Sequence, residues 1–188
     1  MKILGKVFSG IACSFLPVVL LGQQVEKSDV ITSITHEQET GIPYWQDIQT
    51  VSVNREEPRT AFMTYDTRED ALTGEYEKSR FYKLLNGVWQ FYYSDSHRKL
   101  PTDVVDVKAD TKGWSEIQVP GNWEVQGHGT AIYTNHGYEF KPRNPQPPLL
   151  PEANPVGVYR RDFEVPAGWD GRDIYLHIAG AKSGLYVY

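Results

Sequence analysis

The sequence predicts an all-β protein, an antiparallel jelly-roll β-sandwich preceded by an extended N-terminal arm. Two observations carry this prediction. Short apolar stretches separated by Pro, Gly and Asp clusters follow one another from residue 81 onward, and no segment between Asp47 and Tyr188 keeps a 3.6-residue apolar period for long. With 188 residues, of which 40% are apolar and 13% aromatic, the chain is typical of one folded domain.

The clearest strand is expected just after Asn86-Gly87, a dipeptide that favours a tight turn. Val88 and Gln90 then face one way, while Trp89 and Phe91 face the other, so the strand is half buried. Further strands are expected at 116–119, 158–165, 172–178 and 185–188. These are fewer than the roughly eight strands of a jelly roll, and the last one still alternates at its final residue, so we expect a sandwich that is incomplete at its C-terminus.

Three other segments are given a local interpretation. Gly41 to Trp45 places aromatic residues beside a proline, which indicates that it docks onto the folded body. Asp70 to Gly74 is predicted to be a loop. Arg160-Arg161 is expected on an edge strand, with both side chains directed to solvent or to neighbouring acids.

Residues 1–22 have the pattern of a signal peptide. Lys2 and Lys6 supply positive charge, the stretch to residue 21 is strongly apolar, and Gly22 offers a cleavage site before Gln23. The alternative is a permanent membrane anchor. Gly, Ser, Lys and Pro residues interrupt the stretch, which falls short of the roughly 20 clean apolar residues that a span requires. We therefore expect export to the periplasm or the outside, with no membrane span after cleavage.

Cys13 is the only cysteine and lies inside this leader, so the mature chain is expected to form no internal disulfide. A lipoprotein would need Cys13 as the acylated residue, but Gly10-Ile11-Ala12 lacks the usual leucine. Residues 23–44 are polar and aperiodic and are predicted to be a linker or extended arm. Residues 45–188 are predicted to form the β-sandwich domain.

The charge pattern excludes some functions. The net charge is −5 with both signs interspersed, and no basic stripe is present that could neutralise a phosphate backbone, so nucleic acid is not an expected partner. No His/Cys/Asp cluster has metal-ligand spacing, and no glycine-rich phosphate loop is found. The candidate acids stand singly and receive no catalytic role; they are Glu116, Glu124, Glu139, Glu152 and Glu164.

Four sequence elements follow one another in a specific order. They are Leu85-Asn86-Gly87-Val88-Trp89-Gln90-Phe91, Val119-Pro120-Gly121-Asn122-Trp123, Ile132-Tyr133-Thr134-Asn135 and Asn154-Pro155-Val156-Gly157-Val158-Tyr159-Arg160. Each is weak alone, but the series resembles the N-terminal sugar-binding domain of the β-galactosidases of glycoside hydrolase family 2. The resemblance covers roughly residues 45–188 and implies a galactose-binding-domain-like jelly roll, truncated before the catalytic barrel.

This resemblance implies a function for the full-length protein, namely retaining hydrolysis of terminal non-reducing β-D-galactose in lactose and related β-galactosides. Such enzymes use two carboxylates about 5 Å apart. In the family both are glutamates on a (β/α)₈ barrel that follows this region, so the segment alone is expected to be inactive and to brace its own downstream barrel. The family also implies magnesium and sodium, bound mainly beyond this segment, and leaves a homo-oligomer possible.

Asn135 is the one residue to which the resemblance gives a substrate-binding role. Its amide offers both a donor and an acceptor, which suits sugar hydroxyls. From the sequence alone, an asparagine at this place is more typical of a turn. The neighbouring His136 is interpreted as an exposed loop residue. Trp123 could stack on a sugar or pack in the core, and its size favours packing.

Two other functions stay open. One is a stand-alone secreted carbohydrate-binding module without catalysis. The other is a family 2 enzyme that acts on another β-glycoside, such as a glucuronide or a mannoside. This second alternative is disfavoured by the element Ile132 to Asn135 and the proline-rich loop after it. The sequence departs from the family pattern in a long loop at 143–154 and in His128-Gly129, which stand where the family typically has an aromatic residue and an acid.

Overall fold

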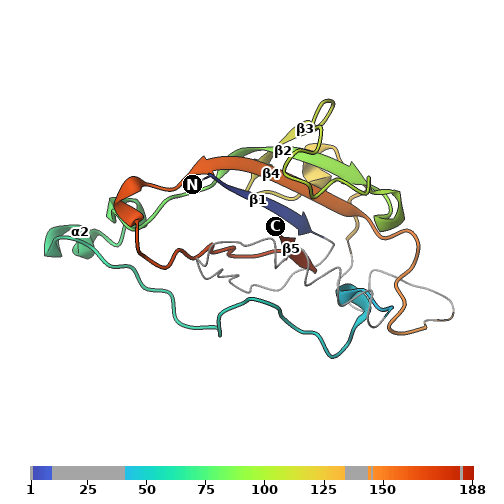
Figure 1. Cartoon of the computed structure of the whole chain (residues 1–188), viewed down its shortest axis with the longest axis horizontal. Coiled ribbons are helices and arrows are strands. Elements are labelled where there is room, and N and C mark those ends of the chain that lie inside the picture. Colours follow the sequence, from blue (N-terminus) through green and yellow to red (C-terminus); the bar gives the residue numbers. More distant parts are fainter. Residues whose placement is uncertain (1, 10–40, 134–143, 145, 183) are drawn as a thin grey trace.

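The structure is a computed structural model that describes residues 2–9, 41–133, 144, 146–182 and 184–188. Its strands form one open sheet in the order β3-β2-β4-β1-β5, and every neighbouring pair is antiparallel (Figure 1). The antiparallel all-β prediction is therefore confirmed. The strands are β1 (Lys2–Ser9), β2 (Gly87–Ser94), β3 (Ser115–Val119), β4 (Val156–Glu164) and β5 (Leu185–Val187).

Four of the expected strands are present, within a residue or two, as β2, β3, β4 and β5. The prediction of a strand at 172–178 is wrong, since within this range only Ile178 takes part in an isolated β-bridge. Alternating apolar residues do not provide a neighbouring strand to pair with, and strand propensity depends on that neighbour. In the connections that the structure describes there are five one-turn 3-10 helices: η1 (Tyr44–Gln46), η2 (Tyr76–Lys78), η3 (His97–Lys99), η4 (Glu124–Gln126) and η5 (Ala167–Trp169).

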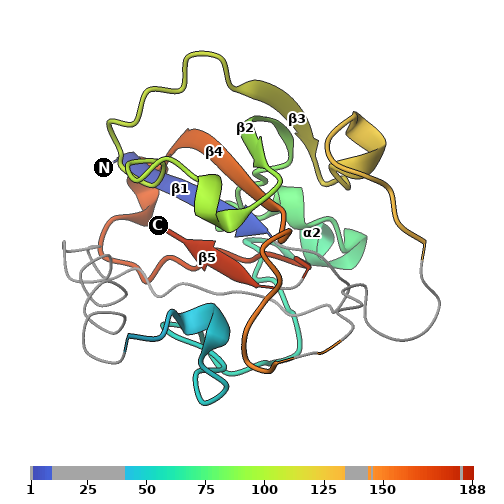
Figure 2. The same ribbon diagram turned by 90° about the vertical axis from the view of Figure 1, so that its right-hand side faces the viewer.

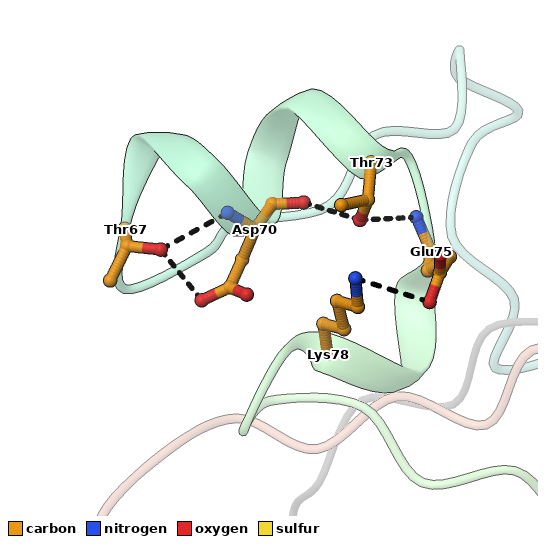
Figure 3. A network of polar contacts seen from close by, with 5 residues as sticks. All are labelled: Thr67, Asp70, Thr73, Glu75 and Lys78. Atoms are coloured by element: carbon orange, nitrogen blue, oxygen red, sulfur yellow. Dashed lines mark hydrogen bonds and ion pairs between the residues drawn. The ribbon is translucent and has the colours of Figure 1, made fainter.

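A short helix, α2 (Arg68–Thr73), replaces the loop predicted at 70–74. At the start of the helix, the hydroxyl of Thr67 accepts a hydrogen bond from the Asp70 backbone N–H at 3.1 Å and donates to the Asp70 carboxylate at 2.6 Å (Figure 3). At its end, Gly74 stops the helix with φ of 70°. These are standard helix caps. The apolar pattern missed the helix because α2 buries no residue.

One face of the sheet carries the hydrophobic core. The alternation predicted for β2 is confirmed, because Trp89 and Phe91 are buried while Val88 and Gln90 are exposed. In the register, Phe91 lies opposite Tyr159 of β4. The core cluster consists of Trp89, Phe91, Ile117, Trp123 and Tyr159.

The other face is covered in part, around Tyr92 and Val158, by the connection between β2 and β3, residues 95–114. Val158 of β4 is fully buried on this face, Val104 of the connection is 5% exposed, and Tyr92 and Trp114 pack with ring centroids 5.6 Å apart. Arg160 holds the connection in place by donating to the carbonyls of Val107 and Ala109. The buried part of β4, Gly157 to Tyr159, is thus protected from water on both faces.

Arg161 points to the core face and binds the segment before β2. Its Nη1 donates to the carbonyls of Leu85 and Asn86, both at 2.9 Å, and its guanidinium lies 5.9 Å from the ring centroid of Trp89. Asn86-Gly87 forms no turn between strands, because β2 begins at Gly87 and the residues just before it, 80–86, are not in a strand.

These contacts correct the interpretation of the arginine pair. Strand β4 is not an edge strand, since β2 pairs with one side of it and β1 with the other. Arg160 and Arg161 are adjacent in a strand and so point to opposite faces. Each binds backbone carbonyls of a different connection, rather than solvent or acids.

The segment before α2, residues 41–67, runs along one side of the molecule (Figures 1 and 2). The prediction that Gly41 to Trp45 docks onto the folded body is confirmed at Trp45, whose ring packs edge-on against His97 at 5.8 Å and Tyr186 at 6.0 Å. Farther along, the Ser79 hydroxyl donates to the Thr64 carbonyl at 2.7 Å and ties the end of this segment to the body.

We expect Gly157→Ala to destabilise the domain, because a Cβ at this position would lie 2.5 to 2.7 Å from ring atoms of Trp123 and Phe91. Overpacking of this kind costs about 1–3 kcal/mol. Urea unfolding followed by Trp fluorescence measures the loss. Gly168→Ala is the matched control, since a Cβ there meets nothing within 4 Å. Equal stabilities for the two variants would contradict the packing argument.

Candidate functional site

The candidate site is the loop at 120–133, which leaves β3 and leads directly to Asn135. Trp123 fixes the start of this loop to the sheet. The side chain is 5% exposed and its ring lies 6.2 Å from that of Phe91 and 5.8 Å from that of Tyr93. Trp123 is therefore a core residue, as the sequence favoured, and its buried face is not free to stack on a sugar.

Gln126, at the end of η4, folds the loop back onto strand β3. Its side-chain carbonyl accepts from the Gln118 N–H at 2.8 Å, and its amide nitrogen donates to the Gln118 carbonyl at 3.0 Å and to the Asn122 carbonyl at 3.4 Å. The amide thus satisfies both backbone groups of Gln118 on the open edge of β3. A backbone edge left unpaired would otherwise accept another chain.

The next part of the loop packs against Tyr93. The ring of His128 lies 4.7 Å from that of Phe91 and 6.2 Å from that of Tyr93. Gly129 has φ of 69°, and a Cβ there would lie 2.8 Å from the Tyr93 hydroxyl. The glycine is required both by its left-handed backbone and by this close approach.

Beyond Gly129 the loop becomes exposed. Ile132 is 61% exposed and Tyr133 is 91% exposed, so both side chains are largely open to solvent. Asn135 and His136 follow immediately but lie outside the described residues, as does Glu139. The structure therefore describes how the loop is anchored and where it leaves the sheet, and the role of Asn135 stays a prediction.

The surroundings of two phenols beneath the loop disfavour their ionisation. Burial, with a smaller contribution from the Glu124 carboxylate, raises the pKa of Tyr159 to about 12. The pKa of Tyr93 is raised as well, first by burial and then by Asp95 and Glu124. An ionised phenol would lose its hydration here and face a like charge, so both side chains keep their protons to a more alkaline pH than an exposed tyrosine does.

The remaining carboxylates that the sequence singled out do not converge. Glu116 lies exposed on β3, Glu164 lies exposed at the end of β4, and Glu152 belongs to the connection that precedes β4. Among the residues that the structure describes, no three His, Cys, Asp or Glu side chains gather into a group that could hold a metal ion. The carboxylates that the sequence singled out therefore stay apart in the described residues.

Sequence reasoning missed Gln126 and did not give His128 a role. The sequence signal for Gln126 was its place between Trp123 and Gly127, a span short enough for one helical turn that brings the amide back to β3. His128 was noted only as a departure from the family pattern. Its ring packs with Phe91 and Tyr93 where an aromatic residue is typical, so the packing function is retained.

No helix in the described ranges is both long and apolar enough to cross a membrane.

The sheet and its anchored loop define an antiparallel β-domain. The family model described as "Glycosyl hydrolases family 2, sugar binding domain" matches residues 82–188. The chain belongs to this family, and the match supports the predicted β-sandwich.

Three relatives illustrate the likeness, each named "Beta-galactosidase". That of Actinobacillus pleuropneumoniae is 36% identical over 145 residues, which is 77% of this chain and 14% of the relative. Those of Psychromonas ingrahamii and Priestia megaterium are each 30% identical, over 77% and 79% of this chain. The chain spans only 13% and 15% of their respective lengths.

We expect Gln126→Glu to loosen the loop at 120–133. A carboxylate still accepts from the Gln118 N–H but cannot donate to the carbonyls of Gln118 and Asn122, and two such bonds are worth about 1–3 kcal/mol together. Amide hydrogen exchange, measured on a peptide from this loop, should become faster. The control is Gln49→Glu, a change at an exposed residue of the segment before α2, which should leave the exchange rate of the loop unchanged. Unchanged exchange in both variants would refute the role of Gln126.

Alkaline pH should destabilise the domain through Tyr159. Its folded pKa of about 12 lies above the ordinary value of 10.0, so the unfolded chain loses this proton first. The stabilisation is complete below pH 10 and is lost as the pH rises from 10 to about 12. Between pH 10 and about 12, the urea midpoint of unfolding should fall less steeply with pH in Tyr159→Phe than in the parent protein. Parallel pH profiles for the two proteins would show that Tyr159 does not cause the alkaline loss of stability.

Proposed function

We propose that the full-length protein is an exported β-galactosidase that removes terminal non-reducing β-D-galactose from lactose and related β-galactosides. The observation that carries this proposal is the match to proteins named β-galactosidase across 77% of the chain. Export to the periplasm or the outside rests on the leader pattern of residues 1–22.

The chain described here would contribute binding rather than chemistry. Retaining hydrolysis needs an acid/base and a nucleophile about 5 Å apart. These two carboxylates are proposed to lie in the remainder of the full-length protein, together with the magnesium and sodium sites that the family implies. No step of the reaction is assigned to a metal held by the described residues, because they contain no group of ligands for one.

Asn135 is proposed to hydrogen-bond the galactosyl unit from the end of the anchored loop. Support comes from the position of the loop: Trp123, Gln126 and His128 fix it to the sheet, and the segment just before Asn135 points away from the body. An amide at this place can donate to one sugar hydroxyl and accept from another.

The first experiment is to sequence the gene beyond the codon for Tyr188, express the longest open frame and assay galactose release from an aryl β-galactoside. Aryl β-glucuronide and β-mannoside are the matched controls for substrate class. Release of galactose alone supports the proposal. A folded product that binds galactosides without hydrolysing any of the three would instead be a carbohydrate-binding module.

In the active full-length protein, Asn135→Ala should lower kcat/KM for the galactoside by about 10- to 100-fold. This corresponds to the loss of one or two hydrogen bonds to sugar hydroxyls that are buried in the complex. Gln90→Ala removes an amide from the exposed face of β2 and should leave kcat/KM unchanged. Equal values for the two variants would remove Asn135 from the site.

A further inference from the structure

His97 lies where several segments of the domain meet. Its ring packs edge-on against Trp45 of the segment before α2, with the ring centroids 5.8 Å apart. Trp45 also packs against Tyr186 of β5, at 6.0 Å. The backbone N–H of His97 donates to the carbonyl of Asn154 at 3.1 Å, in the connection that leads to β4. The contact between His97 and Trp45 thus joins residues 41–67 to the body of the domain.

The backbone that carries His97 is fixed by two buried serines. The Ser94 hydroxyl donates to the Ser96 carbonyl at 2.7 Å, and the Ser96 hydroxyl accepts from the Arg98 N–H at 3.3 Å at the start of η3. Both serines are buried, at 6% and 4% exposed. The ring of His97 therefore separates from Trp45 only if its own side chain rotates or the segment before α2 moves.

One ring nitrogen of His97 is buried without a partner. Its Nδ1 has no hydrogen bond to any of the described residues. A neutral imidazole tolerates this when the proton is on Nε2, because Nδ1 is then an acceptor only. In the imidazolium both nitrogens carry a proton, so Nδ1–H becomes a buried donor without an acceptor, which is costly. The packing around His97 thus accepts the neutral ring and penalises the protonated one.

Charged groups of opposite sign act on His97. Burial has the largest effect and lowers the pKa of His97 from its ordinary value of 6.5, the neighbouring Arg98 lowers it further, and Glu152 of the connection before β4 raises it. The net direction is downward, so the docked state favours the neutral imidazole. On η3 itself, Lys99 is paired with Asp95 at 2.9 Å, and these two charges offset one another.

Within the described residues, the segments on the other side of the contact carry one carboxylate and three phenols. The carboxylate is that of Asp47, two residues after Trp45, and it accepts from the Gln49 N–H at 2.9 Å and from the Thr50 hydroxyl. The phenols are those of Tyr44, Tyr186 and Tyr188. Unperturbed carboxylates and phenols change their charge little between pH 7.5 and 5.0, whereas an imidazole titrates there. His97 is therefore the group at this contact that responds to pH in this range.

We propose that His97 is a pH-sensitive latch that holds Trp45, and with it the first part of the segment 41–67, on the domain while the imidazole is neutral, and releases it when the imidazole is protonated. Because the docked state disfavours the proton, docking is strongest above pH 6.5 and weakens as the pH falls from 6.5 through the lower pKa of docked His97. An imidazolium that turns out to water regains hydration, but Trp45 loses the ring against which it packs.

The far end of the segment stays attached when the latch opens. There the Ser79 hydroxyl donates to the Thr64 carbonyl at 2.7 Å, in a contact that contains no histidine. Between the two anchors, Ile48 and Val51 are 77% and 84% exposed, so these side chains bury little surface. The expected motion is hinged near Thr64 and frees the chain around η1.

The test compares the backbone protection of η1 at two pH values in the full chain. Hydrogen exchange is measured at pH 7.5 and 5.0 on a peptide covering residues 43–50, where the Gln46 N–H donates to the Pro43 carbonyl at 2.9 Å, and is corrected for the exchange of the unstructured peptide at the same pH. So short a turn has little stability of its own, so its protection reports docking. Protection should fall about three-fold or more at the lower pH.

His97→Phe keeps an aromatic ring beside Trp45 but removes the titrating group, so its protection should stay within about two-fold between the two pH values. The matched control is His177→Phe, since His177 is exposed and belongs to another segment. It should keep the response of the parent protein.

Three results would overturn the latch. The first is a parent protein whose protection at 43–50 does not fall at pH 5.0, or rises because the imidazolium forms a cation–π contact with Trp45. The second is an equal fall in His97→Phe, which would assign the response to another group. The third is a parallel loss of protection in β2, which would mean that acid loosens the whole domain.

A second measurement covers the case in which His97→Phe disturbs folding. The pKa of His97 is followed by NMR in the parent protein and in Trp45→Ala. Coupling between docking and protonation is reciprocal, so loss of the indole should raise the pKa of His97 toward 6.5. An unchanged pKa would show that docking of Trp45 does not bury the imidazole, and the proposal would fail. Neither readout depends on hydrolysis, so both are independent of the proposed function.

Discussion

Trp123 and Gly157 form the contact on which the rest of the domain depends. The indole lies against β4 so closely that a Cβ at position 157 would be 2.5 Å from it, and it packs on Phe91 of β2 at the same time. One side chain from a connection thus joins two strands of the sheet. Because protein interiors are close-packed, such a contact has little room to adjust, and the loop that carries Trp123 takes its position from the sheet.

Strand β4 organises the connections on both of its faces. Arg160 and Arg161 are adjacent and point to opposite sides, where each donates to carbonyls of a segment without regular structure of its own. Irregular backbone next to a core has polar groups that need partners. A guanidinium offers several donors in a fixed plane, so one arginine can satisfy two carbonyls and order a whole connection.

Local patterns in the sequence predicted the sheet well and its tertiary contacts poorly. The alternation of Val88 to Phe91 identified β2 and its buried face, because that signal is carried by neighbouring residues. The roles of Gln126 and Arg160 depend on backbone carbonyls brought close by the fold, and no short pattern reports them. Helix α2 was missed since it is held by its caps and not by burial. The site residue Asn135 came only from the family resemblance.

The anchored loop leads toward Asn135, the residue proposed to bind the galactosyl unit. Asn135 comes six positions after Gly129, the last loop residue with a described contact to the core, and six residues span at most about 20 Å. That reach is enough to place an amide in a pocket built by another part of the protein. The precision of that placement depends on Trp123, Gln126 and His128, because flexibility at the anchor is passed on to the tip. Under the proposed role of Asn135, changes in this distant packing should act on sugar binding as well as on stability.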